Sequence, residues 1–226
     1  MLVLIPARLG SKGLKNKNIK NFHGKPLIAH TIIAAKKVKK VNRIIVVTES
    51  KKIKKIAEKF GAEVPFLRPK RLATSSSLAI DSYIYTIKKI QKNEKKKIRT
   101  FMVLLPTSPL RNSNHITKAL NKFNSKKHDS LISVSRSDVP ISWNKILDKK
   151  GFLKEIFIEN GILKNRQHSR ASYIPNGAIY IFKFNLLEKY RKYIFKKTIA
   201  FIMDKRNSID IDNVGEFNLA KKYFKN

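Results

Sequence analysis

Short apolar runs alternate with segments of helical periodicity over most of this chain. Most of the runs are apolar at successive positions, as in strands that are buried on both faces of a sheet. This alternation predicts an α/β protein with a parallel, doubly wound sheet. The strands are expected at 2–5, 43–48, 63–67 and 100–105, and the helices at 26–38, 51–60 and 78–91, the last capped from Ser75–Ser77.

The second half of the chain continues this alternation after an interruption. Residues 139–170 have no clear period, so no element is predicted there. Because no linker divides the chain and no repeat occurs, a single domain over residues 1–226 is expected. Further strands are predicted at 130–135, 176–182 and 199–203, and further helices at 115–123, 186–195 and 214–224.

The composition is that of a globular protein without disulfides. With 226 residues, 42% of them hydrophobic, the chain can bury one substantial core, and zero cysteines exclude thiol catalysis and cysteine-bound zinc. No apolar stretch reaches the roughly 18 residues of a membrane span, and no cleavable signal pattern opens the chain. A soluble, cytoplasmic protein with no insertion into membranes is therefore expected.

The charge balance is strongly basic, with 50 Lys and Arg against 15 Asp and Glu and a formal net charge of +35. A polyanionic partner would be one explanation, which makes a basic nucleic-acid binding protein the non-enzyme alternative. The basic residues are spread through every segment together with many isoleucines and asparagines, and aromatic residues do not interleave with a basic stripe. A compositional bias of the surface is therefore the favoured explanation of the basic charge, and no specific nucleic-acid partner is expected.

A basic loop that contains glycine follows the first strand. Pro6 ends the apolar run, and Gly10 and Gly13 let backbone amides approach an anion. No Walker A or G-x-G-x-x-G pattern fits the loop. It is a candidate polyphosphate site, and a solvated basic turn is the alternative that composition leaves open. The cations of the loop are Arg8, Lys12, Lys15 and Lys17.

Asp210 and Asp212 stand two positions apart in a chain with only 15 acidic residues. On an extended backbone, this spacing directs both carboxylates to the same side. Magnesium that is bound together with a nucleoside triphosphate takes one or two carboxylates and phosphate oxygens, so the pair is a candidate metal site. The alternative is that these aspartates cap the helix that begins near Val214.

Five motifs, in order along the chain, resemble those of one enzyme family. They are I-P-A-R-x-G-S-K-G-x-x-x-K-N at 5–18, FLRP at 66–69, LLPTSPLR at 104–111, IPNGAIYI at 174–181 and SIDID at 208–212. The chain thereby resembles the acylneuraminate cytidylyltransferases, the CMP-sialic acid synthetases. The resemblance implies a Rossmann-like nucleotidyltransferase fold, a three-layer α/β/α structure with a mostly parallel mixed sheet and a small dimerisation extension.

The resemblance also implies roles for individual residues. Catalysis would fall to Arg8, Lys12, Lys17 and Asp212. The nucleotide would contact Ala7, Arg8, Gly10, Ser11, Lys12, Lys17, Asn18, Arg68 and Pro106. The sugar would contact Leu105, Thr107, Ser108, Arg111, Lys145, Arg166, Gln167, Asn176 and Tyr180. The metal would be Mg²⁺, held by Asp210 and Asp212.

The implied reaction transfers CMP from CTP to the anomeric hydroxyl of a nonulosonic acid, such as sialic or legionaminic acid, and releases pyrophosphate for surface glycan biosynthesis. The resemblance further implies a homodimer, with residues of about 139–200 containing the sugar side and the dimer contact. The aromatic segment 190–195 resembles the part that crosses over, although packing within one core would explain it equally. Trp143 is expected in the core, with the wall of a pocket as the alternative.

Several positions depart from the family motifs. Leu105 replaces a glutamine, Ile174 an arginine and Ser75 an aspartate, whereas Glu49 keeps the charge of a family aspartate. Because the phosphate and metal positions are retained, these changes favour an altered sugar. Two alternatives stay open, a 3-deoxy-manno-octulosonate cytidylyltransferase and a degenerate homologue without catalysis.

Overall fold

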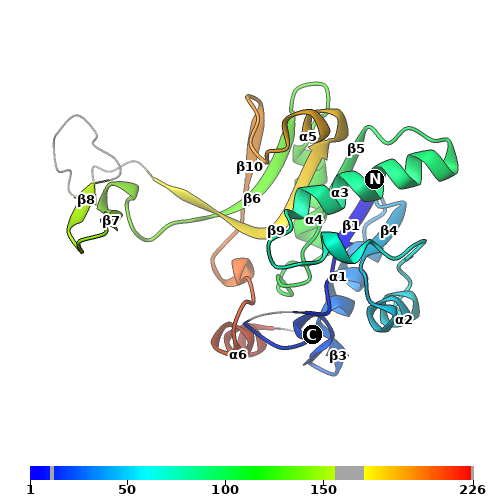
Figure 1. The fold of residues 1–226 in the computed structure, drawn as a ribbon, viewed down its shortest axis with the longest axis horizontal. Helices are drawn as coiled ribbons and strands as arrows, with labels where there is room; N and C mark the ends of the chain where they lie inside the picture. The colour runs from blue at the N-terminus through cyan, green and yellow to red at the C-terminus, as the bar shows by residue number, and fades with distance from the viewer. Residues whose placement is uncertain (11–12, 156–170, 225–226) are drawn as a thin grey trace.

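Residues 1–10, 13–155 and 171–224 are described by the computed structural model, and Figure 1 shows the fold. The central sheet has six strands in the order β10-β6-β9-β5-β1-β4. Strand β9 runs antiparallel to both of its neighbours, and the other pairings in this sheet are parallel. The prediction of an α/β fold with a mixed, mostly parallel sheet is confirmed. The strands are β1 (Leu2–Pro6), β4 (Arg43–Val47), β5 (Thr100–Val103), β6 (Ser130–Arg136), β9 (Tyr173–Lys183) and β10 (Thr198–Ile202).

Helices cover both faces of this sheet. Along β1, the side chains of Val3 and Ile5 pack into one layer and that of Leu4 packs into the other, with no exposed surface on any of them. A strand enclosed on both faces is apolar at successive positions, which explains the apolar runs in the sequence. One layer contains α1 (Leu27–Lys36), α2 (Lys51–Lys59) and α4 (Ser113–Lys122), and the other contains α3 (Ala79–Glu94) and α5 (Phe184–Tyr190).

A third, smaller core lies between α6 (Val214–Tyr223) and the hairpin of β2 (Asn21–Phe22) and β3 (Lys25–Pro26). Leu14 from the basic loop and Ile211 from the aspartate segment (residues 208–212) are both buried in it. The small core therefore holds the loop that follows β1 beside the segment that precedes α6. Short 3-10 helices flank these segments, namely η1 (Lys17–Ile19), η2 (Lys70–Leu72) and η5 (Arg206–Ser208).

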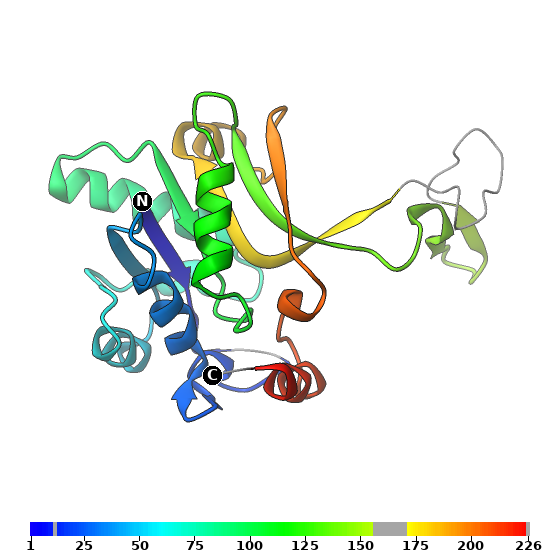
Figure 2. The same ribbon diagram turned by 180° about the vertical axis from the view of Figure 1, so that it is seen from behind.

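Strands β6 and β9 continue beyond the sheet as a ribbon that leads to a projecting arm, which Figures 1 and 2 show from opposite sides. The arm carries the 3-10 helix η3 (Ile141–Trp143) and a hairpin of β7 (Lys145–Leu147) and β8 (Leu153–Glu155). Much of its apolar surface is exposed. The large apolar side chains exposed there are Val139, Ile141, Trp143, Ile146, Leu147, Phe152, Leu153, Tyr173 and Ile174.

Two predicted local features are wrong. Residues 63–67 form no strand and join the sheet only through a bridge from Glu63 to Ile45, because Pro65 has no amide proton to continue the ladder. The serines at 75–77 do not cap α3. Its N-cap residue is Leu78, which makes no side-chain bond to the helix.

Two predictions for segments that contain aromatic residues are also partly wrong. The helix predicted at 186–195 ends at Tyr190, since Arg191 has a left-handed φ of 48°. Phe195 beyond it is buried in the core of the sheet, which agrees with packing inside one core. Trp143, expected in the core, is 51% exposed because the arm leaves the core. No helix within the described ranges has the length and apolar character needed to cross a membrane.

Candidate active site

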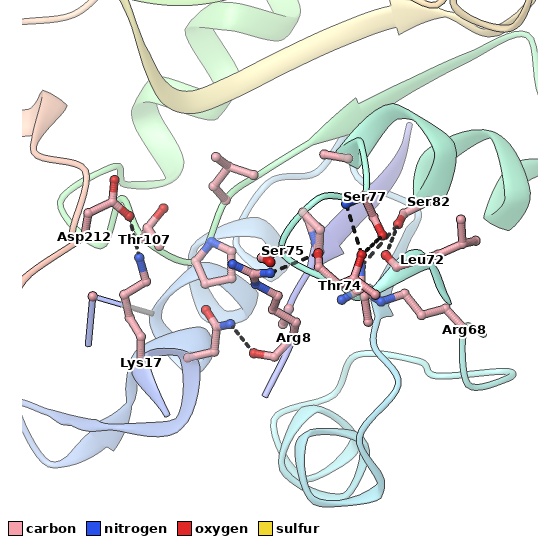
Figure 3. A pocket seen from close by; sticks show the side chains of 18 of the residues that line it. Arg8, Lys17, Arg68, Leu72, Thr74, Ser75, Ser77, Ser82, Thr107 and Asp212 are labelled. Carbon is pink, nitrogen blue, oxygen red and sulfur yellow. Dashed lines mark hydrogen bonds and ion pairs between the residues drawn. The ribbon is translucent and has the colours of Figure 1, made fainter. Parts of the chain in front are cut away.

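A cavity of about 480 Å³ opens where β1 and β5 end, at the carboxyl edge of the parallel strands. The loops after these two strands line it together with the segments around residues 68–82 and 210–212. In the close view of Figure 3, Lys17 and Asp212 lie at one end and Arg8 lies near the middle. The hydroxyl groups of Thr74, Ser77 and Ser82 lie toward the other end.

The loop after β1 is held in place by its own polar groups. The Ala7 amide donates to the Val47 carbonyl at 3.0 Å, which extends the pairing of β1 with β4 by one residue. The Asn18 side-chain amide donates to the Arg8 carbonyl at 2.9 Å. Gly13 lies against the main chain of Asp212, where a Cβ would overlap the carbonyl oxygen. The loop can therefore approach the aspartate segment this closely only with glycine at that position.

Lys17 joins the loop to the aspartate segment. Its ammonium group donates to the Ile211 carbonyl and to Asp212 Oδ1, the second contact at 2.7 Å. The Lys17 side chain is almost buried, whereas that of Asp212 is 77% exposed. Helix α6 is capped by Asn213, which accepts the Glu216 amide at 2.9 Å. The alternative that Asp212 serves as the helix cap is therefore wrong, and its carboxylate faces the cavity and solvent.

Asp210 is the largely buried member of the aspartate pair. Its Oδ1 atom has no hydrogen-bond partner among the described residues. Burial raises the pKa of its carboxyl group above the usual value, and the hydrogen bond from the Thr107 side chain opposes this rise. A hard cation can supply the partner that such a buried carboxylate oxygen lacks.

Strand β9 bulges beside Asp210. The register shifts within the pairing of β6 and β9, because Ile132 pairs with Tyr180 whereas Val134 pairs with Pro175. Gly177, inside the bulge, has a φ of +72°, and a Cβ there would lie 2.7 Å from Asp210 Oδ2. The bulge thus brings the main chain of β9 against the aspartate.

Asn176 holds this bulge from within. Its Oδ1 accepts a hydrogen bond from the Ser133 hydroxyl at 2.6 Å, and its Nδ2 donates to Ser208 Oγ at 2.8 Å. These bonds connect β6, β9 and the beginning of the aspartate segment. Asn176 is buried and does not line the cavity, so its position supports a structural role.

The far end of the cavity is rich in hydroxyl groups. Arg8 Nη1 donates to the Thr74 carbonyl at 3.1 Å, which ties the guanidinium to this end. Ser82, in α3, donates to the Leu72 carbonyl at 3.1 Å. Thr74 and Ser77 belong to one short segment, and their Oγ atoms share a hydrogen bond at 2.6 Å. The cavity-lining residues that the sequence had not indicated as ligand contacts include Thr74, Ser77 and Ser82.

The structure brings most of the expected nucleotide and metal residues together around this cavity. Their roles stay predictions. Ser11, Lys12, Arg166 and Gln167 lie outside the described residues. The expected residues that line the cavity are Ala7, Arg8, Lys17, Asn18, Arg68, Leu105, Pro106, Thr107, Asp210 and Asp212.

Arg111 and Ser108, expected at the sugar, are buried beneath the loop after β5. Arg111 is 1% exposed and donates to the Thr31 hydroxyl at 2.7 Å and to the Leu105 carbonyl at 3.3 Å. Burial lowers its pKa to about 9. Because neither side chain reaches the cavity surface, their positions do not support direct contact with a sugar. Arg111 instead holds the main chain of the loop from behind.

Three further expected residues lie away from the cavity lining. Tyr180 packs against the rings of Phe182 and Tyr193, and burial raises its pKa to about 12. Lys145 lies on the arm and pairs with Glu155 at 3.0 Å. Gly10 is exposed on the outer part of the loop.

A mixed α/β sheet with a cationic loop after its first strand and a carboxylate pair beside that loop is typical of nucleotide-binding proteins. The family model described as cytidylyltransferase matches residues 2–216. The chain belongs to this family, and it is a nucleotidyltransferase. The prediction of the family is confirmed.

Individual relatives agree with this assignment. The chain is 35% identical over 221 residues to the N-acylneuraminate cytidylyltransferase of Escherichia coli O18:K1:H7 (strain RS218 / NMEC), across 97% of this chain and 51% of that protein. It is 35% identical over 227 residues to the CMP-N,N'-diacetyllegionaminic acid synthase of Legionella pneumophila subsp. pneumophila (strain Philadelphia 1), across 98% and 95% of the two chains. The chain thus spans about half of the first relative and nearly all of the second.

A solved structure shows the same fold. A CMP:2-keto-3-deoxy-manno-octonic acid synthetase complexed with CTP superimposes with a TM-score of 0.71 at 14% identity. The match covers 98% of this chain and 96% of that chain. At this identity the likeness concerns the fold alone.

We predict that Gly177→Ala lowers kcat/KM for nucleotidyl transfer at least tenfold, which is about 1.4 kcal/mol of transition-state stabilisation. The added methyl group would displace Asp210. The measurement is the transfer rate, read beside the thermal unfolding of each variant. Gly24→Ala is the matched control, since Gly24 has a φ of +76° and open space around its missing Cβ. Equal losses of transfer in both variants would attribute the effect to backbone strain and not to Asp210.

Proposed function

We propose that this chain transfers CMP from CTP to the anomeric hydroxyl of a nonulosonic acid, sialic acid or a relative such as legionaminic acid, and releases pyrophosphate for surface glycan biosynthesis. One observation carries the proposal, namely that the cationic loop and the aspartate pair meet through the contact of Lys17 with Asp212 in one cavity. The names of the relatives, which refer to N-acylneuraminate and diacetyllegionaminic acid, supply the acceptor class.

The cavity offers separate surroundings for the parts of CTP. Its hydroxyl-rich end, with Thr74, Ser77 and Ser82, suits the uncharged nucleoside. Arg8 lies near the middle of the cavity and Lys17 lies at the opposite end, and both would compensate the charge of the triphosphate and of the departing pyrophosphate. Lys12 is proposed to add a further cation on the same loop.

Cytidylyltransferases of this kind are generally metal-dependent, and we propose Mg²⁺ as the ion. The donor set fits, because Asp210 has a buried oxygen without a partner and Asp212 presents an exposed carboxylate. No group of three or more ligating side chains occurs among the described residues, which agrees with an ion that takes its other ligands from phosphate and water. When bound, Mg²⁺ would neutralise phosphate charge. Asp212 would then exchange the ammonium group of Lys17 for the ion.

In the proposed reaction, the anomeric hydroxyl oxygen forms a bond to the α-phosphorus as the bond from that phosphorus to the bridging oxygen of pyrophosphate breaks, and the hydroxyl proton is released to solvent. The residues of this chain contribute position and charge, and no side chain forms a covalent intermediate. Leu105 places an apolar side chain on the cavity wall near Gly177 and Asp210, where the family motif has an amide. This difference is the proposed basis for an acceptor other than common sialic acid.

We predict that the wild-type protein releases pyrophosphate from CTP and Mg²⁺ with one of the nonulosonic acids in a panel of N-acetylneuraminate, legionaminate and pseudaminate, and not with 3-deoxy-manno-octulosonate, which is included for comparison. Asp210→Asn and Asp212→Asn should each lower turnover at least 100-fold, because each removes a proposed metal ligand. The control is Asp129→Asn, which breaks the 3.1 Å pair with Lys183 outside the cavity and should keep most of the activity.

The outcomes of this experiment differ in meaning. Turnover with 3-deoxy-manno-octulosonate alone would replace the proposed acceptor class. Binding of CTP without turnover on any sugar would favour the degenerate homologue. Ordinary activity in the Asp210→Asn, Asp212→Asn double variant would contradict the metal assignment.

We also propose that the protein is a homodimer joined through the arm. The arm exposes several large apolar side chains, including Leu147 at 68% and Leu153 at 71%, which a monomer would leave in water. Dimerisation would cover them and bring Lys145 and the arm close to a neighbouring sugar pocket. The residues of about 139–200 would then contain the sugar side and the dimer contact.

We predict a solution mass of about twice the 26.1 kDa of the chain, measured by size-exclusion chromatography with light scattering. The double variant Leu147→Ser, Leu153→Ser should shift it to the monomer mass, since it removes two apolar contacts. Val214→Ser, which changes an apolar side chain exposed outside the arm, is the control. A fully active wild-type monomer would contradict this proposal.

A further inference from the structure

Glu49 is a carboxylate enclosed between the loop that follows β1 and Arg68. It lies just beyond β4, and its side chain is 16% exposed. Oε1 accepts the Leu9 amide at 2.8 Å, and Oε2 accepts Nε and Nη2 of Arg68 at 3.1 and 2.9 Å. Glu49 does not line the cavity, so any effect on a ligand would act through the residues that it holds.

The first of these effects concerns the peptide group between Arg8 and Leu9. Its carbonyl oxygen accepts the Asn18 side chain at 2.9 Å, and its amide donates to Glu49 at 2.8 Å. Two side chains from different segments therefore fix the plane of one peptide. Because this peptide follows the Cα of Arg8 directly, fixing it restrains the main chain from which the Arg8 side chain enters the cavity.

The second effect concerns the charge of Arg68, whose side chain is 6% exposed and lines the hydroxyl-rich end of the cavity. Its Nη1 donates to Ser82 Oγ at 3.3 Å, and its other two nitrogens donate to Glu49. All three nitrogens are thus engaged before a ligand arrives, and the charge has a partner in a site with little water. Arg68 can then support the nucleoside end as a fixed wall, without attracting phosphate to it.

We propose that Glu49 is a positioning residue for the nucleotide. Glu49 aligns Arg8 through the Arg8–Leu9 peptide, and its carboxylate compensates the positive charge of Arg68. The proposal rests on the proposed function in taking CTP as the ligand. Loss of the carboxylate weakens the binding of CTP. It also releases Arg68 from its fixed position, so that the nucleoside end of the cavity loses a rigid wall and discrimination against UTP narrows.

The test compares Glu49→Gln with Glu49→Asp in the full chain. Glu49→Gln keeps the size and removes the charge, and it should raise KM for CTP about tenfold, with kcat within about threefold of the wild type. The preference for CTP over UTP, measured as the ratio of kcat/KM values, should fall at least threefold. Glu49→Asp restores the charge and should recover part of both effects. Thermal unfolding reports whether each variant is folded.

A double-mutant cycle with Arg68→Gln tests whether Glu49 acts through Arg68. We expect the double variant to lose less CTP affinity than the sum of the two single losses, because only the part of the effect that passes through Arg68 is already absent in Arg68→Gln, whereas the part that passes through the Arg8–Leu9 peptide is still lost. The matched control is Glu63→Gln, because Glu63 accepts Nε of Arg43 through both oxygens, at 2.9 and 2.8 Å, on the outer edge of the sheet. That variant should leave KM and the CTP preference unchanged.

Lower stability of Glu49→Gln with unchanged KM and unchanged preference would overturn the proposal, and so would fully additive losses in the cycle. CTP affinity measured by calorimetry separates this proposal from the proposed function. If the wild type binds CTP but transfers it to no sugar, the affinities of the Glu49 variants still decide the role of Glu49. A wild-type protein that does not bind CTP would overturn both.

Discussion

The contact between Lys17 and Asp212 is the interaction on which this cavity depends. It joins residues 195 positions apart, at 2.7 Å, and connects the loop after the first strand with the segment before the last helix. The small core behind it holds Leu14 and Ile211 together, and Gly13 gives the main chains room to approach. Without this closure, the cations of the loop and the carboxylates of the aspartate segment would face separate regions of solvent.

The cavity is balanced in charge although the chain carries +35. Lys17 pairs with Asp212 and Arg68 pairs with Glu49, so these two buried cations of the cavity lining each have an acidic partner close to them. A site of this kind keeps its side chains in fixed positions before the ligand arrives, which is what electrostatic catalysis requires. The excess of lysine lies elsewhere and, being solvated, contributes little to the geometry of the site.

The bulge of β9 allows a close contact between the sheet and Asp210 that a regular strand would not allow. A flat antiparallel strand between β5 and β6 would keep its main chain in the sheet, whereas the extra residues let Gly177 approach Asp210. Beyond the bulge, β6 and β9 leave the core and form the arm, where apolar side chains lie in water. The bulge in β9 thus lies between the part of the strand that is buried in the sheet and the part that leads to the exposed arm.

Most of the central sheet and the identity of the two charged segments could be read from the sequence. Strands such as β1 and β5 are covered on both faces, so burial appears directly as consecutive apolar residues, and the motifs at 5–18 and 208–212 are local in the chain. The segment at 63–67 misled because Val64 is buried without a strand ladder around it. The local pattern of apolar residues indicates that a segment is buried, but it does not indicate whether its main chain pairs with a strand.

Only the tertiary structure decided how polar residues are used. Arg111 belongs to a motif at the cavity, yet it is buried behind the loop, and Trp143 is exposed because its segment leaves the core. Glu49 and Gly177 gain their roles from partners that are distant in sequence, such as Leu9 and Asp210. Hydrophobic periodicity depends on one face of one element, whereas the position of a charged group depends on which distant segments close around it.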